Sequence, residues 1–348
     1  MSRLGKPVLV TGAGGFIGSH VVEILLRHGH QVRALVHYNS QGSWGHLREL
    51  GHSNHSQRSL SVEEQDQNPV PGQLEVRLGD VTDPHLLRSL VDGCGVVLHL
   101  AALIGIPYSY HAPASYLATN VGGTLNVLEA CRQAGVRRVV VTSTSEVYGT
   151  ARYAPIDEAH PLQAQSPYAA SKIAADKLAE SYFCSYGLPV VVLRPFNTYG
   201  PRQSARAVIP TVMVQAMGGA SEIRLGNLTP QRDLTFVEDT ARAFLLATEA
   251  PDIEGEVIHF GQGNAISVAE LAQRCLDAAA CGSQTHIVST AERQRPAKSE
   301  VELLVCNAAK ARRLLGWTPQ VPLEEGLRRT ADYLRAHLAQ YRAGDYAV

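Results

Sequence analysis

Short apolar runs alternate with amphipathic stretches over roughly the first half of the chain. Between the runs, apolar residues recur at helical spacing, as in residues 118–134. Strands that alternate with amphipathic helices predict a parallel sheet with helices on both faces. The nearly continuous apolar segments indicate strands that are buried on both sides. The expected strands are residues 7–10, 32–36, 75–78, 95–100, 136–143 and 189–194.

The pattern changes after Arg194, where turn-forming and polar residues precede a second group of helices. We therefore expect a large domain of residues 1–195 plus 235–264. A smaller interleaved C-terminal lobe of residues 196–234 plus 265–348 should close over a ligand. The polar stretch 51–72 has no periodicity and is expected to be a mobile insertion. Helices are expected at residues 209–217, 238–248, 268–279 and 323–338, and one more strand at 256–260.

Composition excludes several classes of protein. The formal net charge of −1 over 348 residues offers no field that would attract nucleic acid or an acidic membrane surface. The six cysteines form no CxxC pair, and the scattered histidines lack paired ligand spacing, so we expect reduced thiols and no metal site. Neither a leader pattern nor a membrane-length apolar run is present, which indicates a cytoplasmic protein.

A glycine-rich turn connects the first expected strand to the first helix. Gly12, Gly15 and Gly18 have the spacing TGxxGxxG, and Phe16 and Ile17 lie at the start of the helix. Such a turn lets the backbone approach a pyrophosphate and directs free N–H groups of the helix N-terminus at the anion. The motif predicts a Rossmann-type, doubly wound α/β fold that binds NAD or NADP.

The end of the second strand distinguishes the two cofactors. An acidic residue there binds the ribose 2′-hydroxyl of NAD, whereas a nearby arginine accepts the 2′-phosphate of NADP. The sequence places His37 at this point and has neither signal, while Arg33 lies inside the strand. NAD is favoured and NADP stays possible. Asp80, after the third strand, has two interpretations, as an adenine contact or as a turn or helix cap before Asp83.

A YxxxK pair provides candidate catalytic groups. Tyr168 and Lys172 are one helical turn apart, on a helix that Ser166 should cap. A lysine cation and a bound nicotinamide should lower the pKa of the phenol, so that it can remove a proton from a sugar hydroxyl. Thr144 ends the fifth strand, where ligands of parallel sheets lie, and could bind the same hydroxyl.

Several segments together resemble the extended short-chain dehydrogenases that act on nucleotide sugars. The resemblance covers nearly the whole chain except residues 51–72, and is nearest to the 4,6-dehydratases of UDP- or GDP-N-acetylglucosamine. It implies a nucleotide-sugar substrate, cofactor contacts from Val81, Leu100, Ala101 and Ala102, and a homodimer formed by two helices from each subunit. The segments are TGAGGFIG, HLAA, TSTSEVYG, SPYAASK, RPFNTYGPRQ and QRDLTFVEDTA.

The resemblance also assigns chemistry to the segment after Thr144. Simple 4-epimerases of the family generally lack a carboxylate at the position of Glu146, whereas dehydratases need one to remove the C5 proton. dTDP-glucose dehydratases have Asp where this chain has Ser145, and GDP-mannose dehydratases resemble it in having Ser–Glu. The proton for the departing C6 hydroxyl then comes from Glu146, Ser145 or water. A solvated charge at a strand end is the simpler interpretation of Glu146.

The resemblance further implies which residues bind the diphosphate. Asn197, Arg232 and Arg295 match family positions that face the pyrophosphate, and a guanidinium donates two hydrogen bonds to phosphate at once. Glu300 either accepts from the ribose or begins a helix. Asn120 is expected at the cofactor site, where it supports the active-site helix. Sugar and base contacts are expected from Tyr108 or Tyr110, and from Arg206 and Val208 around residues 207–210.

These observations favour an NAD(P)-dependent 4,6-dehydratase of UDP- or GDP-N-acetylglucosamine. A 4-epimerase is one alternative. A UDP-glucuronate decarboxylase is another, although no extra cation for the C6 carboxylate is identifiable in the sequence. A regulator that senses NAD(P) without catalysis belongs to a different class, because fold does not fix function. The intact Thr144, Tyr168 and Lys172 argue against it.

Overall fold

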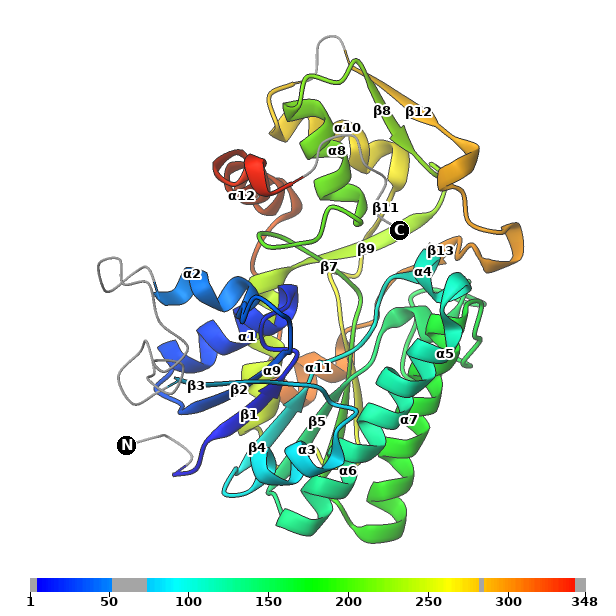
Figure 1. Cartoon of the computed structure of the whole chain (residues 1–348). Helices are drawn as coiled ribbons and strands as arrows, with labels where there is room; N and C mark the ends of the chain where they lie inside the picture. The colour runs from blue at the N-terminus through cyan, green and yellow to red at the C-terminus, as the bar shows by residue number, and fades with distance from the viewer. Residues whose placement is uncertain (1–4, 52–73, 282–284, 342–348) are drawn as a thin grey trace.

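The computed structural model describes residues 5–51, 74–281 and 285–341, and Figure 1 shows a large sheet domain beneath a smaller lobe. The expected insertion 51–72 lies outside these residues apart from Gly51. The large sheet has seven parallel strands in the order β3-β2-β1-β4-β5-β6-β10. Its strands are β1 (Val8–Thr11), β2 (Val32–His37), β3 (Leu74–Gly79), β4 (Val96–His99), β5 (Arg138–Thr142), β6 (Val190–Pro195) and β10 (Val257–Phe260).

The strand order confirms the doubly wound α/β fold. From β1 the chain builds outward through β2 to β3, and then crosses to β4 and continues through β5 and β6 to β10. Ligands of such sheets bind at the carboxyl ends of the strands beside this change of direction, here between β1 and β4. The fold therefore places the turn after β1 and the segments after β4 and β5 at one edge.

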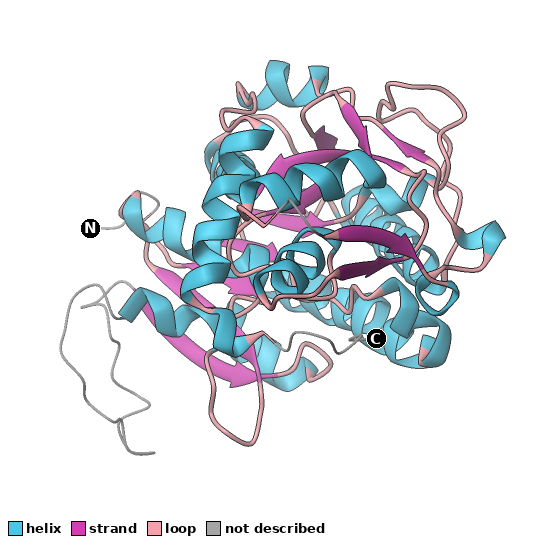
Figure 2. Ribbon diagram, turned by 90° about the horizontal axis from the view of Figure 1, so that it is seen from above, coloured by secondary structure: helices cyan, strands magenta, loops and turns pink. Residues whose placement is uncertain are grey.

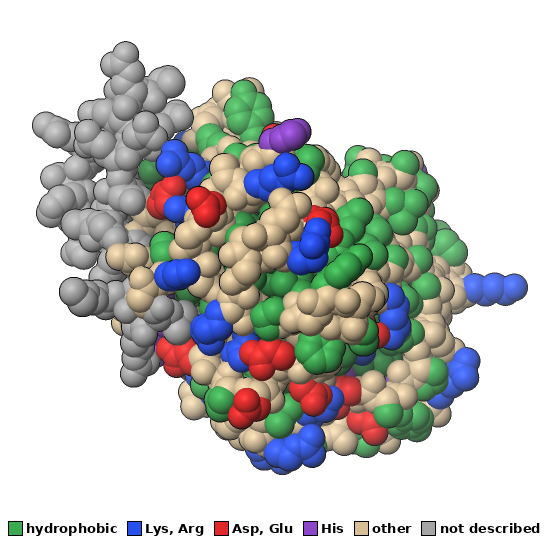
Figure 3. Space-filling view, turned by 90° about the horizontal axis from the view of Figure 1, so that it is seen from below, with side chains coloured by type: hydrophobic (Ala, Val, Ile, Leu, Met, Phe, Trp, Pro, Cys, Tyr) green, Lys and Arg blue, Asp and Glu red, His purple; other side chains and the backbone are tan. Residues whose placement is uncertain are grey.

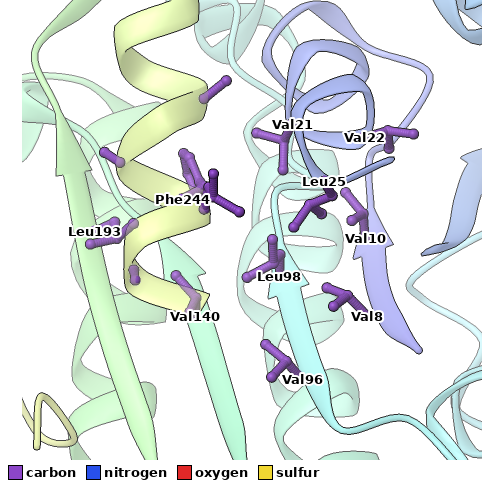
Figure 4. Packing of buried hydrophobic residues seen from close by; sticks show 14 of the residues in the cluster. Val8, Val10, Val21, Val22, Leu25, Val96, Leu98, Val140, Leu193 and Phe244 are labelled. Carbon is purple, nitrogen blue, oxygen red and sulfur yellow. The ribbon is translucent and has the colours of Figure 1, made fainter. Parts of the chain in front are cut away.

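Helices cover both faces of the sheet, and Figure 2 shows these layers from above. Apolar side chains of the strands and of three helices fill one interface, where Val10, Leu25, Leu98 and Phe244 point toward one another (Figure 4). The second face buries Leu87 and other residues of three further helices. The helices of the first face are α1 (Phe16–Arg27), α9 (Val237–Glu249) and α11 (Ala309–Leu315), and those of the second are α3 (Pro84–Val91), α6 (Gly123–Ala134) and α7 (Pro167–Tyr186).

Local signals in the sequence explain where the helices begin and end. The Ser166 side chain accepts from the N–H of Ala169 at the start of α7, Pro167 is its first residue, and Gly187 ends it with φ of +63°. The first turn of a helix offers no acceptor for its N–H groups, so proline, which has no N–H, loses no hydrogen bond there. Glycine ends the helix because it adopts the left-handed conformation without strain. The predicted cap of the active-site helix is confirmed.

The smaller lobe packs three helices around its own apolar core. They are α8 (Val208–Met217), α10 (Val268–Ala278) and α12 (Leu323–Ala336), with the paired strands β8 (Glu222–Leu225) and β12 (His286–Ser289). Strands β7 (Asn197–Tyr199), β9 (Gln231–Phe236), β11 (Ala265–Ser267) and β13 (Leu303–Leu304) lie where the lobe meets the large domain. The described residues also form the short helices α2 (Arg48–Gly51), α4 (Ile106–His111) and α5 (Pro113–Tyr116), besides several single-turn helices.

One segment departs from the expected division of the chain. The sequence pattern places residues 265–348 in the lobe, but Ala311, Leu315 and Trp317 belong to the core cluster of the large sheet. The indole N–H of Trp317 donates to the carbonyl of Asp239 in α9. Burying the indole beside Phe260 stabilises this placement, because large aromatic side chains bury the most apolar surface.

A fully buried carboxylate joins β9 to two other segments. The oxygens of Asp233 accept N–H bonds from Gln262 at 2.7 Å, Gly263 at 2.8 Å and Cys306 at 3.0 Å. In an Asp233→Asn variant the amide nitrogen cannot accept, so at least one buried N–H loses its partner. We expect a loss of about 2–3 kcal/mol of unfolding free energy in urea titrations. The exposed control Asp332→Asn should stay within about 0.5 kcal/mol of wild type; equal losses would contradict this account.

The charges on the surface and the state of the cysteines are those that the composition predicts. On the face seen in Figure 3, acidic and basic side chains are interspersed. The cysteines are free thiols, and Cys94, Cys131, Cys275 and Cys306 are buried. Among the described residues, no helix combines the length and the apolar composition that a bilayer span requires.

Candidate active site

The glycine turn after β1 is shaped by contacts that allow no side chain. Gly12 has φ of +69°, and a Cβ on it would lie 2.8 Å from the backbone nitrogen of Ala101. A Cβ on Gly18 would lie 2.2 Å from the Gly12 carbonyl oxygen. The first hydrogen bond of α1 runs from Ser19 to Gly15, which leaves the N–H groups of residues 16–18 without an intrahelical acceptor. This cradle of free donors fits a dinucleotide pyrophosphate.

Adding one methyl group at Gly18 should weaken NAD binding. In Gly18→Ala the new Cβ overlaps the Gly12 carbonyl, so the turn must move away from the position of the pyrophosphate. We expect at least about a tenfold rise in the Kd for NAD, measured by calorimetry. A matched Gly122→Ala variant, whose Cβ would meet only the Leu117 oxygen at 3.8 Å, should keep the wild-type Kd. Equal affinities in both variants would disprove the cradle.

The ends of β2 and β3 lie beside the turn. His37 Nδ1 is 3.4 Å from Asp80 Oδ2, and both side chains are accessible. Arg33 is occupied elsewhere, because it donates to Glu75 at 2.8 Å and to the Leu90 carbonyl at 2.7 Å. It is therefore not free to bind a 2′-phosphate, which agrees with the expectation of NAD. Asp80 also accepts from the N–H of Thr82 at 2.8 Å, so its turn-forming role is present.

The segment after β4 is held against the glycine turn. The hydroxyl oxygen of Thr11 accepts N–H bonds from Leu100 at 3.2 Å and from Ala101 at 3.1 Å. These bonds hold the backbone of Leu100 and Ala101, which leads on to Ala102, next to Gly12. The side chain of Val81 is buried in the core of the second sheet face, so only its backbone is available to a cofactor.

The candidate acid–base groups converge at the carboxyl end of β5. Thr144 precedes the short 3₁₀ helix η4 (Ser145–Tyr148), and its hydroxyl lies close enough to the Tyr168 phenol to act against the rise in the pKa of that phenol. Ser145 and Glu146 are buried, with Glu146 only 8% exposed. Glu146 is close enough to Tyr168 for its charge to raise the pKa of the phenol. A solvated strand-end charge, the simpler interpretation of Glu146, is wrong because this carboxylate is enclosed.

The expected lowering of the phenol pKa is not present in the protein alone. Burial raises the pKa of Tyr168, and the Thr144 hydroxyl only partly opposes this rise. Lys172 is itself buried and donates to the Thr142 carbonyl at 2.6 Å. Burial lowers the pKa of Lys172, while the charge of Asp176 opposes that shift. Any lowering of the Tyr168 pKa therefore depends on the positive charge of a bound nicotinamide.

A π-helical segment supports the active-site helix. Residues Leu117–Gly122 form η3, which orients Asn120 so that its amide donates to Ser171 of α7 at 2.9 Å. The same amide exchanges two bonds with the backbone of Leu103. These partners occupy the side chain, so the structure agrees with the supporting role of Asn120 and not with a side-chain contact to the cofactor.

Three charged residues that are expected at the nucleotide sugar lie together. Glu300 Oε1 is 3.5 Å from Arg232 and 3.6 Å from Arg295. Burial lowers the pKa of Arg232, and the charges of Glu146 and Glu300 oppose this shift. Arg232 thus lies near both the candidate base Glu146 and the pair of Arg295 and Glu300. Arg295 and Glu300 also line a cleft of about 250 Å³.

The remaining substrate candidates come from three separate segments of the chain. Asn197 begins β7, and its Oδ1 is buried with no hydrogen-bond partner among the described residues. Arg206 lies beside Gly105 and Tyr116. Val208, two residues further along the chain, is the first residue of α8. Tyr108 is 40% exposed, and its ring lies 6.2 Å from that of Tyr116.

Two residues that contact the candidate site have no recognisable signal in the sequence. The ring of Tyr116 packs edge-on against Tyr168 at 6.2 Å. Gln165 donates to the carbonyls of Lys298 and Glu300, and so ties the segment that carries Glu300 to the start of α7. Neither residue belongs to a motif, and only the folded arrangement reveals them. No group of three or more His, Cys, Asp or Glu side chains in the described ranges could hold a metal ion.

Comparison with known proteins identifies the family of this chain. The sequence profile of the GDP-mannose 4,6 dehydratase family matches residues 9–330. The chain belongs to this family. The family match spans both the sheet domain and the lobe, so it includes the glycine turn, the Thr144–Glu146 segment and the arginines Arg232 and Arg295.

Individual members and neighbours include both dehydratases and epimerases. A dTDP-glucose 4,6-dehydratase of an Actinoplanes species is 31% identical, over 95% of this chain and 98% of the relative. DesIV, a dTDP-glucose 4,6-dehydratase from Streptomyces venezuelae solved with NAD and TYD bound, is 30% identical with a TM-score of 0.83, covering 97% of this chain and 99% of DesIV. A UDP-N-acetylglucosamine 4-epimerase from Methanobrevibacter ruminantium, in complex with UDP-N-acetylmuramic acid, is 27% identical with a TM-score of 0.81, covering 97% of this chain and all of the epimerase.

Proposed function

We propose that the protein catalyses the NAD-dependent 4,6-dehydration of UDP- or GDP-N-acetylglucosamine to the 4-keto-6-deoxy sugar. The observation that carries this proposal is the enclosed Glu146, which lies within electrostatic reach of Tyr168 and Arg232. Oxidation at C4 needs only the Thr144, Tyr168 and Lys172 groups. A second base beside them is the additional element that loss of water from C5 and C6 requires.

Oxidation begins at the C4 hydroxyl. Tyr168 removes the hydroxyl proton as a phenolate, and Thr144 holds the same oxygen through its side chain. Lys172, fixed by the Thr142 carbonyl, places a positive charge behind the phenolate. The glycine turn at Gly12 and Gly18 would hold NAD, which would supply a hydride acceptor for C4 and a hydride donor for C6. The residues of the chain therefore supply the proton transfer and the orientation of the sugar.

Elimination follows from the acidity that the C4 ketone confers on C5. Glu146 takes the C5 proton, a C5–C6 double bond forms, and the C6 hydroxyl leaves. That hydroxyl takes a proton from Glu146, Ser145 or water, and departs as water. A hydride then adds to C6 and a proton to C5, so the net change is the loss of one water. A positioned general base of this kind contributes about 10²–10⁴ in rate.

The substrate assignment rests on the anion site and on similarity. Arg232 and Arg295 suit a diphosphate, because a guanidinium donates paired hydrogen bonds to phosphate oxygens. The N-acetylhexosamine is favoured because the segments LIGIPYSYHAP around Tyr108 and GPRQSARAVIPT around Arg206 resemble dehydratases of such sugars. The UDP-N-acetylglucosamine 4-epimerase among the structural neighbours supports the same class of substrate.

A 4-epimerase is the second candidate, since that epimerase shares the fold with a TM-score of 0.81. Epimerisation uses Thr144, Tyr168 and Lys172 but gives Glu146 no chemical task. The position of Glu146 therefore favours the dehydratase.

Mass spectrometry of the products separates the candidates. The protein is incubated with NAD and either UDP- or GDP-N-acetylglucosamine. Loss of one water from one of the sugars supports the proposal. An isomer of unchanged mass supports the epimerase, and no change with either sugar contradicts both.

The proposal includes a cytoplasmic homodimer in which α6 and α7 of each subunit pack together. Leu125 on α6 and Phe183 and Tyr186 on α7 support it, because these large apolar side chains are exposed in the single chain. Light scattering at micromolar concentration should give the mass of two chains, and a monomeric mass would contradict this part of the proposal.

A further inference from the structure

A buried arginine connects the two ends of the segment that carries the candidate base. Arg194 of β6 is 2% exposed, and its Nη1 donates to the Tyr148 hydroxyl at 2.6 Å. Its Nε and Nη2 donate to Asp176 of α7 at 3.1 and 2.9 Å. The same Asp176 oxygen accepts from the hydroxyl of Ser143 at 2.6 Å. Ser143 and Tyr148 flank residues 144–147, so one guanidinium is linked to both ends.

The direction of each hydrogen bond follows from the donors. Arginine can only donate, so the Tyr148 oxygen accepts from Arg194, and the Tyr148 hydrogen is left for Nε2 of His259. Burial lowers the pKa of His259, so its ring is neutral and can accept. The phenol of Tyr148 is therefore held from two sides, by β6 and by β10.

The held phenol restrains Glu146 through the backbone. Ser145–Tyr148 form a single 3₁₀ turn, in which the N–H of Val147 bonds to the Thr144 carbonyl and that of Gly149 bonds to the Glu146 carbonyl. Glu146 and Tyr148 belong to the same hydrogen-bonded turn, so a displacement of Tyr148 is passed to the backbone of Glu146. The Ser143 end leads directly to Thr144 instead. The two ends of the network thus act on different chemical groups.

We propose that Arg194, Asp176 and Tyr148 form a positioning network that aims Glu146 at C5, while Ser143 aims Thr144 at the C4 hydroxyl. The proposal rests on the proposed dehydratase function and assigns its two chemical steps to the two ends of one network. The four network residues are buried and hydrogen-bond to one another, so we assign them a positioning role and no contact with the reacting atoms. A misplacement of about 1 Å can cost about a hundredfold in rate, so small shifts at either end should be measurable.

Single-turnover kinetics distinguish positioning from general stability. In Tyr148→Phe we expect water loss to slow by about tenfold to a hundredfold, with less change in C4 hydride transfer, which is followed by absorbance of reduced nicotinamide. The reduced cofactor and the keto sugar should then accumulate. In Ser143→Ala the order reverses, and hydride transfer should slow more than water loss. The ratio of the two rates counts only active molecules, so partial unfolding does not disturb it.

The matched control is Tyr199→Phe, which removes a buried hydroxyl that donates to the Leu323 carbonyl in the lobe at 3.1 Å. We expect its ratio of rates to equal that of wild type. An unchanged ratio in Tyr148→Phe, or the same change in Tyr199→Phe, would overturn the positioning network. If Tyr148→Phe does not fold, the ratio in Ser143→Ala decides, and no shift there overturns the proposal. If the wild type removes no water from either sugar, the proposed function is wrong and the network assignment falls with it.

Discussion

Replacing Glu146 with glutamine should stop water loss while leaving oxidation at C4 detectable. The amide has nearly the shape of the carboxylate but cannot take the C5 proton, so we expect elimination to slow by about 10²–10⁴. Glu146 is buried beside Tyr168 and Thr144, and the oxidation groups remain in place in the variant. Single-turnover absorbance of reduced nicotinamide measures oxidation, and mass spectrometry of the sugar measures water loss.

A remote glutamate supplies the control for this substitution. Glu254 pairs with Arg138 at the opposite end of β5, away from the candidate site. Glu254→Gln should keep both steps at the wild-type rate. Full water loss in Glu146→Gln would remove its role as the base, and loss of both steps together would indicate that the substitution disturbs the site instead.

Replacing Tyr168 with phenylalanine should remove the first step and everything after it. The ring keeps its edge-on contact with Tyr116, but no group remains to take the hydroxyl proton. We expect hydride transfer to fall by about 10²–10⁴ while the nucleotide sugar still binds. The sugar's Kd from calorimetry should therefore stay near the wild-type value, and retained turnover would contradict the assignment.

The pH dependence of hydride transfer tests the same phenol. Burial raises the pKa of Tyr168, so the proton stays on the phenol at neutral pH in the protein alone. The base is the deprotonated form, and its population increases with pH below the pKa. The rate in wild type should therefore increase with pH, and the residual rate of Tyr168→Phe should lack this increase. A wild-type rate that does not change with pH would contradict a phenolate base.

The alternating pattern is sufficient to predict the sheet, because strands buried on both faces must be apolar along their whole length. The Ser166 cap and the glycine turn are equally predictable, since each depends on a few neighbouring residues. Arg232 and Glu300 lie far apart along the chain, yet the resemblance places both near the nucleotide sugar, and the structure brings them within 3.5 Å of each other. Their contact with a substrate stays a prediction. The sequence therefore predicts that these two charged groups lie together, but not whether they bind a ligand.

Other features depend on contacts between distant segments and have no local signal. The packing of Trp317 on the large sheet depends on the position of α9. The raised pKa of Tyr168 arises from burial, which a YxxxK spacing does not report. Arg194 stands in the RPFNTYGPRQ segment, yet its partners Asp176 and Tyr148 come from two other segments. Networks of this kind become visible only when the fold is known.

The central claim is that a phenolate and a carboxylate act in sequence beside one nicotinamide, so that a C4 ketone makes C5 acidic. The most direct measurement is turnover of UDP- and GDP-N-acetylglucosamine in deuterium oxide, with NMR of the product. The account predicts a 4-keto-6-deoxy sugar that carries solvent deuterium at C5 and the original C4 hydrogen at C6. A product with its C6 hydroxyl intact and no deuterium at C5 would contradict it.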